Sequence, residues 1–315
     1  MDFIHSTVTE INEAAKTPQS FINASEKRYK NEVYAAAQTI ADNDDIKIVA
    51  LAGPSGSGKT TTAHILCDRL IELGETPTVV SLDDFYLSGE ELPILPDGSR
   101  DIESVNALDI PLINHCFNEI ITKGKTLLPR YDFPNKKSIR EGNEVDISNK
   151  GIIIVEGLHA LNPLITDLVP RGNIYKVYIS VNCSILDRFG EQLLSSRQIR
   201  LARRVIRDRI FRGTDVKTTL SLWNGVVEGE RKYLYCFKNT ADVLIKTLHH
   251  YEPCVYRDEF LSLKSEITPE TDCYEYFMRT AEALEKFDSI NCDLLPENSL
   301  IREFVGNGKY NQEEK

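Results

Sequence analysis

The sequence predicts an α/β fold in which a doubly wound parallel sheet is built around a phosphate-binding loop, with helical extensions at both ends of the chain. Three observations support this prediction. Short, continuously apolar stretches of strand length recur through the middle of the chain, and stretches with helical spacing alternate with them. This alternation is typical of parallel strands that are buried on both faces and connected by helices. A glycine-rich loop follows the first apolar stretch and precedes a helical one.

The expected elements follow one another in a regular order. Helical spacing over residues 26–41 indicates a first helix, and an Asn-Asp-Asp turn ends it. Continuous apolar runs predict five strands, at residues 46–52, 78–82, 152–155, 174–179 and 241–245. Helices are expected at residues 60–73 and 108–123, each followed by a glycine, and in one long helical region at 195–237. Residues 126–144 are mixed and predict short strands or a hairpin.

The composition narrows the classes of function. Of the 315 residues, 37 are Lys or Arg and 48 are Asp or Glu, which gives a net charge of −11. This charge argues against a nucleic acid or an anionic membrane as the partner, so any polyanion needs a local basic site. The seven cysteines form no Cys-x-x-Cys pair, and residues 1–16 lack the basic start and apolar stretch of a signal peptide. We therefore expect a reduced, cytoplasmic protein without disulfides or structural zinc.

The string GPSGSGKT at residues 53–60 fits G-x-x-x-x-G-K-[ST], the phosphate-binding P-loop. Its glycines let backbone N–H groups turn toward a phosphate, Lys59 adds positive charge at the outer phosphates, and the Thr60 hydroxyl can hold Mg²⁺. The helix that follows directs its positive N-terminus at the same anion. The expected ATP-binding residues are Gly53, Pro54, Ser55, Gly56, Ser57, Gly58, Lys59, Thr60 and Thr61. The alternative, a Gly-Ser turn with an incidental lysine, does not explain why the loop lies between a strand and a helix.

Two other classes of P-loop protein fit the sequence less well. A GTPase needs an Asn-Lys-x-Asp string, and the nearest match, Asn-Lys-Lys-Ser at residues 135–138, lacks the acid. A transporter ATPase needs a signature loop, but Leu-Ser-Gly-Glu-Glu at residues 87–91 has a glutamate where a glycine is required and lies too close to the P-loop. The remaining class, a small-molecule kinase, is favoured.

A kinase needs a metal, a positioned acceptor hydroxyl and positive charge around the transferred phosphoryl group. Carboxylates for the first two tasks are expected beside the P-loop, at the carboxyl ends of neighbouring strands. Asp83 and Asp84 follow one expected strand, and Glu156 follows another. One aspartate can accept the hydroxyl proton, and Glu156 can orient a water on Mg²⁺. The alternatives are a solvated turn for the aspartates and a helix cap or a structural ion pair for Glu156.

Residues 197–212 form a strongly basic segment, with seven arginines and a single acid, Asp208. On a helix, four of these arginines share one face: Arg200, Arg203, Arg204 and Arg207. Such a row can close over ATP as a lid and neutralise the transferred phosphoryl group. A solvated face paired with acids elsewhere and a nucleic-acid-binding helix are the alternatives, and the P-loop favours the lid.

Taken in order, these motifs resemble the uridine kinase and phosphoribulokinase family of P-loop kinases over about residues 46–247. The likeness rests on the P-loop, SLDDFY at 81–86, PRYDF at 129–133, VEG at 155–157, RRVIRD at 203–208, RG at 212–213 and ADV at 241–243. A closer likeness is to bacterial nucleoside kinases that carry a threonyl-tRNA-synthetase-like N-terminal region. That group shares DIESVNALD at 101–109, EGLHALNP at 156–163 and NSLIREF at 298–304. Because only about 45 residues precede the core, the synthetase-like region itself is not expected.

The resemblance implies roles for individual residues. Asp83, rather than Asp84, would be the base that takes the proton of the sugar 5′-hydroxyl group. Tyr86 and Tyr131 would contact the nucleoside, and Asp109 would lie near the ribose hydroxyls. Arg204 would lie near both the substrate and the phosphates. The catalytic or phosphate-binding side chains would be Lys59, Arg204, Arg207 and Arg212.

Two positions depart from the family pattern. Lys136 stands about where uridine–cytidine kinases have a histidine that helps to read the pyrimidine, so it becomes a candidate substrate contact. Thr214 stands where these kinases have an arginine just after the Arg-Gly of the lid. The first departure bears on base recognition, and the second bears on one phosphate contact.

The expected activity is ATP- and Mg²⁺-dependent phosphorylation of a nucleoside 5′-hydroxyl group, with uridine or cytidine as substrate. One alternative is the same machinery acting on another small alcohol, such as a sugar phosphate or a pantothenate-like acceptor. The other is an ATP-binding regulatory module without turnover. Asp83 and Glu156 argue against the module, since a protein that only binds ATP needs no base.

We expect three segments: an N-terminal helical extension at residues 1–45, a P-loop kinase domain at 46–250 and a C-terminal helical appendix at 251–315. Helical spacing in the appendix, with a break at Thr268-Pro269, predicts packing either on the core or on a second subunit of a homo-oligomer. Trp223 is expected to pack within a helix. Structural or surface roles are expected for His64, His159, His249 and His250, which lack partners at metal-ligand spacing.

Overall fold

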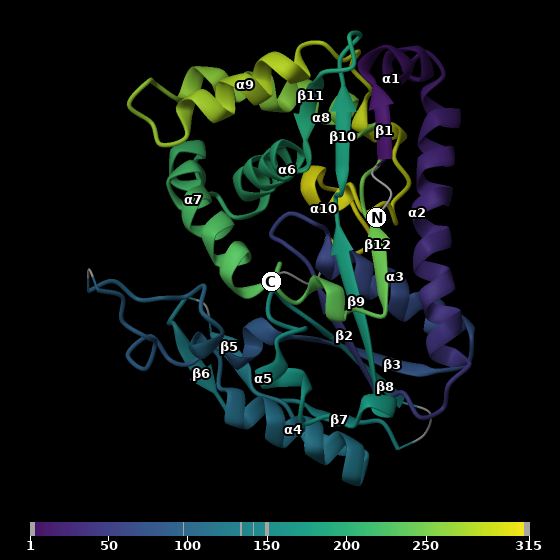
Figure 1. The fold of residues 1–315 in the computed structure, drawn as a ribbon, viewed down its shortest axis with the longest axis vertical. Helices are drawn as coiled ribbons and strands as arrows, with labels where there is room; N and C mark the ends of the chain where they lie inside the picture. Colours follow the sequence, from purple (N-terminus) through teal and green to yellow (C-terminus); the bar gives the residue numbers. More distant parts are fainter. Residues whose placement is uncertain (1–3, 97, 133, 141, 149–150, 312–315) are drawn as a thin grey trace.

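The computed structural model describes residues 4–96, 98–132, 134–140, 142–148 and 151–311. At its centre lies a five-stranded parallel sheet with the strand order β12-β9-β2-β8-β3 (Figure 1). Its strands are β2 (Ile48–Ala52), β3 (Thr76–Ser81), β8 (Gly151–Glu156), β9 (Ile174–Ser180) and β12 (Val243–Lys246). The predicted doubly wound sheet is confirmed, and each predicted strand lies within two residues of the observed bounds.

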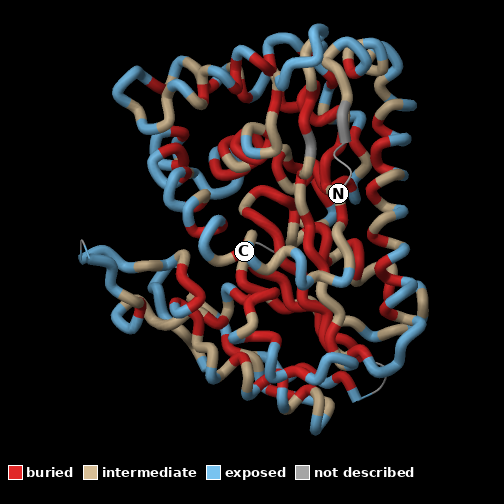
Figure 2. Tube along the Cα trace, in the orientation of Figure 1, coloured by how far each residue is buried: buried red, intermediate tan, exposed pale blue. Residues whose placement is uncertain are grey.

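Side chains of the central strand alternate between two hydrophobic clusters, one on each face of the sheet. In β2, Val49 and Leu51 belong to the larger cluster, and Ile48 and Ala50 belong to the other. Helix α3 (Lys59–Glu72) covers the first face, and α4 (Ile110–Lys123) and the short α5 (Pro163–Thr166) cover the second. Burial on both faces explains why the strands read as continuous apolar runs, and Figure 2 shows the buried trace running through the sheet.

Both ends of the chain pack on the face that α3 covers. Helix α2 (Pro18–Ala41) runs along α3 and buries Tyr29 in the larger cluster, to which α8 (Glu252–Ser262) and α9 (Tyr274–Leu284) also contribute. The rings of Phe260 in α8 and Phe277 in α9 stack with their centroids 4.3 Å apart. The C-terminal helices therefore pack on the core of their own chain. The division into three domains stays a prediction.

The long helical region expected at residues 195–237 is divided into two helices. Helix α6 (Ser196–Phe211) ends before Gly213, whose φ is +58°, and α7 (Val216–Tyr233) begins after Asp215. The Asp215 carboxylate accepts the N–H of Thr218 at 2.8 Å, which is a typical N-terminal helix cap. Trp223 in α7 is 1% exposed and packs in the larger cluster, as predicted.

Several short strands lie outside the central sheet. Strands β1 (Ile4–Thr7), β10 (Cys183–Leu186) and β11 (Gln192–Ser195) form a three-stranded sheet that the sequence did not predict, because these segments are short and not continuously apolar. In the mixed region, the two antiparallel pairs are β4 (Lys125–Leu127) with β7 (Glu144–Asp146), and β5 (Arg130–Asp132) with β6 (Lys137–Ile139). Across the described residues, no helix combines the length and apolar character that a membrane span requires.

Candidate active site

The P-loop joins the end of β2 to the start of α3, at the middle of the sheet's carboxyl edge. Gly56 and Gly58 have φ values of +71° and +88°, in the left-handed region that glycine adopts at little cost. Lys59 is the first residue of α3, and its Nζ lies 3.5 Å from the carbonyl oxygen of Pro54, across the loop. The first N–H groups of α3 have no acceptors within the helix, so they point toward the position where an anion can bind.

Thr60 and Glu156 meet beside the loop, as the sequence led us to expect for a Mg²⁺ site. The Thr60 hydroxyl donates to Oε1 of Glu156 at 3.2 Å, and Glu156 is 7% exposed. Burial raises the pKa of Glu156 to about 7; Lys59 opposes the rise, whereas Asp83 and Glu303 add to it. A hydroxyl and a buried carboxylate without a strong counter-ion fit a Mg²⁺ site, in which waters and phosphates supply the remaining ligands. Within the described residues, no group of three or more His, Cys, Asp or Glu side chains is arranged to hold a metal.

The two aspartates after β3 have different surroundings. The Asp83 residue is exposed at the surface, and partial desolvation by the surrounding protein raises the pKa of its carboxyl group, an effect that Lys59 and Arg212 oppose. Asp84 accepts the backbone N–H of Tyr131 at 3.2 Å and so holds the β5–β6 pair against the turn that follows β3. Asp83 therefore lies near the P-loop lysine with an accessible carboxylate, whereas Asp84 has a structural contact.

The arginine row on α6 does not act as one unit, which corrects the expectation of a single lid face. Arg200 and Arg203 are 4% and 0% exposed and lie behind the P-loop. Arg200 pairs with Glu230 of α7 and donates from Nε to the carbonyl oxygen of Ser55 at 2.8 Å. Glu230 also accepts the N–H of Ser55 at 2.8 Å, so both backbone groups of Ser55 are held.

A second buried pair supports the next residue of the loop. Arg203 contacts both carboxylate oxygens of Glu252 in α8, at 2.7 and 3.0 Å, and donates from Nη1 to the carbonyl oxygen of Gly56 at 3.1 Å. Although burial alone would lower the pKa of Arg203, Glu252 raises it, so the guanidinium stays charged. Both arginines are therefore used to hold the loop and are not available to bind phosphate.

Three other arginines of this segment are held by Asp208. Ion pairs join Asp208 to Arg204 at 3.4 Å, to Arg207 at 2.7 Å and to Arg212 at 3.5 Å. Arg204 also donates from Nη1 to the Ser55 hydroxyl at 2.8 Å, which fixes its guanidinium at the P-loop. The Arg212 side chain is 48% exposed. Of these three arginines, Arg204 contacts the loop directly.

Two tyrosines predicted to contact a nucleoside lie together. The rings of Tyr86 and Tyr131 have centroids 5.7 Å apart and planes inclined at 57°. The Tyr86 hydroxyl donates to the carbonyl oxygen of Ile102 at 3.2 Å, which fixes one edge of the pair. Tyr86 lies three residues after Asp83, so the tyrosine pair is next to the exposed acid.

Other predicted substrate contacts have different partners. Asp109 caps α4 by accepting the N–H of Leu112 at 3.0 Å, and its second oxygen pairs with Arg140 at 2.9 Å. Lys136 is exposed in the β5–β6 turn, where φ is +49°, and its carbonyl oxygen accepts the N–H of Gly89 at 3.0 Å. Phe133 of the Tyr-Asp-Phe string lies outside the described residues.

Three acidic residues near the site were assigned no role from the sequence. Glu230 holds Ser55 from α7, where no motif marks it. Glu103 is half-buried; burial raises its pKa and Arg204 opposes this rise. Glu303 contacts Thr61 at the start of α3. Glu103 and Glu303 fall in the strings at 101–109 and 298–304 that carry the narrower resemblance, so a signal for these two was present.

A P-loop at the centre of a parallel sheet, an accessible acid after the neighbouring strand and an arginine fixed on the loop are the parts of a phosphoryl-transfer site. The protein is an ATP-dependent kinase of the P-loop class. The sequence model of the Phosphoribulokinase / Uridine kinase family matches residues 48–252, which is well over half of the chain. The chain belongs to this family, as predicted, and the narrower likeness to kinases with a synthetase-like region stays a prediction.

Individual relatives agree with this assignment. The uridine kinase of Lactobacillus helveticus is 26% identical over 200 residues, which cover 63% of this chain and 85% of that protein. The uridine kinase of Halobacterium salinarum is 22% identical over 199 residues, which cover 62% and 78% of the two chains. A crystal structure from Silicibacter, described as a candidate fructose transport system kinase, superposes with a TM-score of 0.50 at 18% identity, over 67% of this chain and 98% of that one. The superposition supports the fold.

Proposed function

We propose that the protein transfers the γ-phosphoryl group of ATP to the 5′-hydroxyl group of a nucleoside, with uridine and cytidine as the preferred acceptors and pyrimidine salvage as the role. The proposal depends on one observation: the accessible carboxylate of Asp83 lies near Lys59 of the P-loop, whose positive charge opposes the rise of its pKa. Two relatives named uridine kinase support a nucleoside as the acceptor. The paired rings of Tyr86 and Tyr131 offer an aromatic surface next to Asp83.

In the proposed reaction, the loop amides and Lys59 hold the β- and γ-phosphates. Asp83 accepts the proton of the acceptor hydroxyl as its oxygen bonds to the γ-phosphorus and the bond to the β-phosphate oxygen breaks. Arg204, held by Ser55 and Asp208, stabilises the charge on the transferred group, and Arg207 and Arg212 assist. Mg²⁺, bound by the Thr60 hydroxyl and by Glu156 through water, would neutralise phosphate charge.

A second candidate is the same transfer to another small alcohol, such as a sugar phosphate or a pantothenate-like acceptor. Two positions expected to contact a nucleoside favour it. Lys136 is exposed at a turn, and both carboxylate oxygens of Asp109 already have partners within the protein, so neither side chain is committed to a nucleoside. The candidate fructose transport system kinase adds a sugar to the acceptors worth testing. A binding module without turnover is disfavoured, since it needs neither Asp83 nor Glu156.

The test is ADP release from ATP and Mg²⁺ with a panel of nucleosides and small alcohols. We expect release with uridine or cytidine and little without an acceptor. Release only with a non-nucleoside alcohol would select the second candidate, and release that is absent or independent of acceptor would contradict both kinase assignments. Lys59→Ala is the control: it should weaken nucleotide binding and turnover together, because it removes positive charge from the phosphate site.

The cellular setting is part of the same proposal. We propose a cytoplasmic enzyme with no nucleic acid or membrane partner that can form a homo-oligomer. The reducing environment is supported by the free thiols of six cysteines, which are Cys67, Cys116, Cys236, Cys254, Cys273 and Cys292.

A further inference from the structure

A C-terminal segment outside the family match reaches the nucleotide site. Residues 298–311, called the strap from here on, cross the start of α3 and include α10 (Arg302–Val305). The family match ends at residue 252, so the strap belongs to the part of the chain that the family does not describe.

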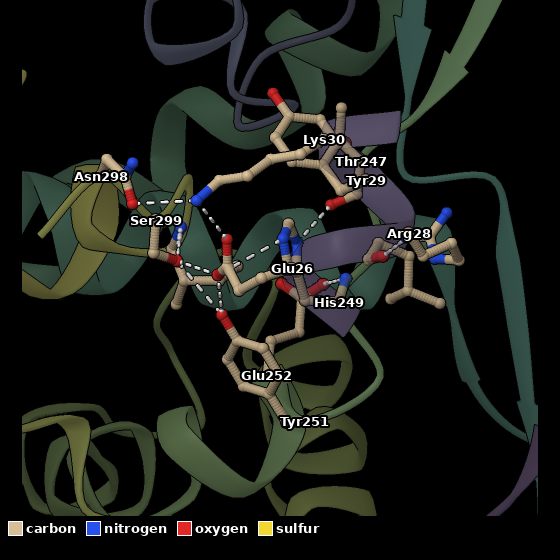
Figure 3. A network of polar contacts seen from close by, with 12 residues as sticks. Glu26, Arg28, Tyr29, Lys30, Thr247, His249, Tyr251, Glu252, Asn298 and Ser299 are labelled. Atoms are coloured by element: carbon tan, nitrogen blue, oxygen red, sulfur yellow. Dashed lines mark hydrogen bonds and ion pairs between the residues drawn. The ribbon is translucent and has the colours of Figure 1, made fainter. Parts of the chain in front are cut away.

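The first end of the strap is fixed by a buried polar network (Figure 3). The Ser299 hydroxyl and the Tyr251 hydroxyl both donate to Oε1 of Glu26, at 2.5 and 2.6 Å. Lys30 donates to the side-chain oxygen of Asn298 at 2.9 Å. Because Glu26 and Lys30 come from α2, the N-terminal extension holds the start of the strap.

The far end of the strap is fixed on α3 itself. The ring of Tyr310 stacks on His64 with centroids 5.6 Å apart and planes 10° apart. The Tyr310 hydroxyl donates to Asp68 at 2.7 Å, and Lys309 forms an ion pair with the same carboxylate. The strap is therefore fixed at both ends, by contacts with α2 at its start and with His64 and Asp68 of α3 at its far end.

Between these two ends the strap touches the P-loop. Leu300 packs so tightly against Gly58 that a Cβ at this glycine would lie 2.6 Å from the Leu300 Cδ1. Glu303 accepts the hydroxyl of Thr61 at 2.7 Å and approaches the Thr61 N–H at 3.4 Å. A cavity of about 330 Å³ lies beside Thr61 and Glu303, and its lining also includes Thr60, His64, Glu156 and Tyr310.

The position of the Glu303 carboxylate has an electrostatic consequence. Thr61 is the third residue of α3, so its N–H has no acceptor within the helix and belongs to the donors that a P-loop directs at phosphate. A phosphate group and a carboxylate cannot both take these donors, and their negative charges repel each other. Glu303 and Glu156 line the same cavity, and the charge of Glu303 adds to the rise of the Glu156 pKa.

We propose that Glu303 is a competitor built into the nucleotide site: its carboxylate holds the two Thr61 donors and must leave them when a triphosphate binds. The strap thereby sets nucleotide affinity and moves with nucleotide occupancy. This inference rests on the proposed function, because it needs a nucleotide at the P-loop. The alternative is that Glu303 is only a helix cap for α3, in which case its charge does not oppose nucleotide binding.

The test compares two substitutions that remove the same charge from the full-length protein. Glu303→Gln keeps the size of the side chain and a neutral acceptor for Thr61. Glu297→Gln is the matched control, since Glu297 is exposed just before the strap and its carbonyl oxygen accepts the N–H of Lys309 at 2.7 Å. Calorimetry should give Kd values for ADP and for ATP with Mg²⁺ that are roughly 3- to 30-fold lower for Glu303→Gln than for the wild type, and unchanged for Glu297→Gln.

A second measurement needs no variant. Amide hydrogen exchange at residues 298–306 of the wild type should become faster when ADP is added, because Glu303 leaves Thr61. Slower or unchanged exchange would contradict the proposal that Glu303 competes with the nucleotide. A Kd for Glu303→Gln that equals or exceeds the wild-type Kd would contradict it as well. Both outcomes leave the proposed function intact. A wild-type protein that binds no nucleotide would overturn both.

Discussion

Charged residues lie on two sides of the P-loop, and their partners differ. The side on which α6, α7 and α8 hold the loop backbone is called behind the loop, and the side with Asp83 and Glu156 is called in front of it. Behind the loop, Arg200 and Arg203 are buried and paired with Glu230 and Glu252. In front of it, Glu156 is also buried, yet no ion pair to it is found within the described ranges. The arginines and glutamates behind the loop neutralise each other within the protein. The carboxyl group in front has a raised pKa and can give up its proton when a cation binds.

This difference separates a supporting role from a chemical one. A buried ion pair costs desolvation, and that cost is offset only when both partners have good geometry and further hydrogen bonds. The pairs behind the loop meet this condition and also hold the backbone of Ser55 and Gly56. The carboxyl groups in front, Asp83 and Glu156, have pKa values that desolvation raises and that Lys59 only partly lowers. Removing charge should therefore have opposite consequences on the two sides.

The largest expected effect is on turnover in front of the loop. Asp83→Asn should lower kcat by roughly 10²- to 10⁴-fold, since an amide cannot accept the acceptor proton. The affinity for ATP should change little, because the loop and Lys59 remain. Steady-state kinetics and a direct ATP-binding measurement check both outcomes.

Asp84→Asn is the matched control for that experiment. Its carboxylate accepts the N–H of Tyr131, and an amide oxygen can do the same. We expect a much smaller loss of turnover than for Asp83→Asn. If Asp83→Asn were as active as the wild type and Asp84→Asn inactive, the assignment of the base would be wrong.

The next effect is on stability, behind the loop. Glu252→Gln leaves the guanidinium of Arg203, which is 0% exposed, without its counter-ion. The free energy of unfolding should fall by about 3–5 kcal/mol. Urea unfolding at pH 7.5 measures this loss. A change below about 1 kcal/mol would mean that the buried pair does not support the loop.

The same substitution in front of the loop should act in the opposite direction. Burial gives the Glu156 carboxyl a pKa of about 7, above its ordinary value of 4.5, so the folded state holds a proton that the unfolded state has lost. The wild type therefore loses stability as the pH rises from about 4.5 to about 7. Glu156→Gln lacks this loss, and above pH 7 without Mg²⁺ it should be more stable than the wild type by about 1–3 kcal/mol.

Unfolding curves at a series of pH values test this prediction for Glu156. The difference in unfolding free energy between Glu156→Gln and the wild type should grow between pH 5 and pH 7 and then level off. A difference that is constant over this range would mean that Glu156 titrates as an ordinary carboxyl group. Turnover of Glu156→Gln should fall, since the proposed Mg²⁺ site loses its carboxylate.

The sequence could predict the parts of the site that lie within one short string or directly after a strand. The P-loop is one continuous string, and Asp83 and Glu156 follow strands whose apolar runs are continuous because both faces are buried. Helical spacing also placed Arg203 and Arg204 correctly on one helix.

Spacing could not separate those two arginines, because the difference comes from a distant partner. Arg203 meets Glu252, 49 residues further along the chain, and Arg204 meets Ser55 of the P-loop. The contact between Thr61 and Glu303 spans 242 residues. Such pairings depend on how helices pack, and periodicity within one segment carries no information about them.

The smallest expected effect concerns Tyr235, which bonds to the buried pair of Arg200 and Glu230 behind the P-loop. The Tyr235 hydroxyl donates to Glu230 and accepts from Arg200, both at 3.0 Å. Tyr235→Phe removes these bonds and keeps both the ion pair and the Ser55 contacts. We expect a loss of about 1 kcal/mol in unfolding free energy and a kcat within roughly twofold of the wild type. If kcat fell tenfold while stability changed this little, Glu230 would need Tyr235 to hold Ser55. The buried ion pair alone would then not fix the position of the P-loop.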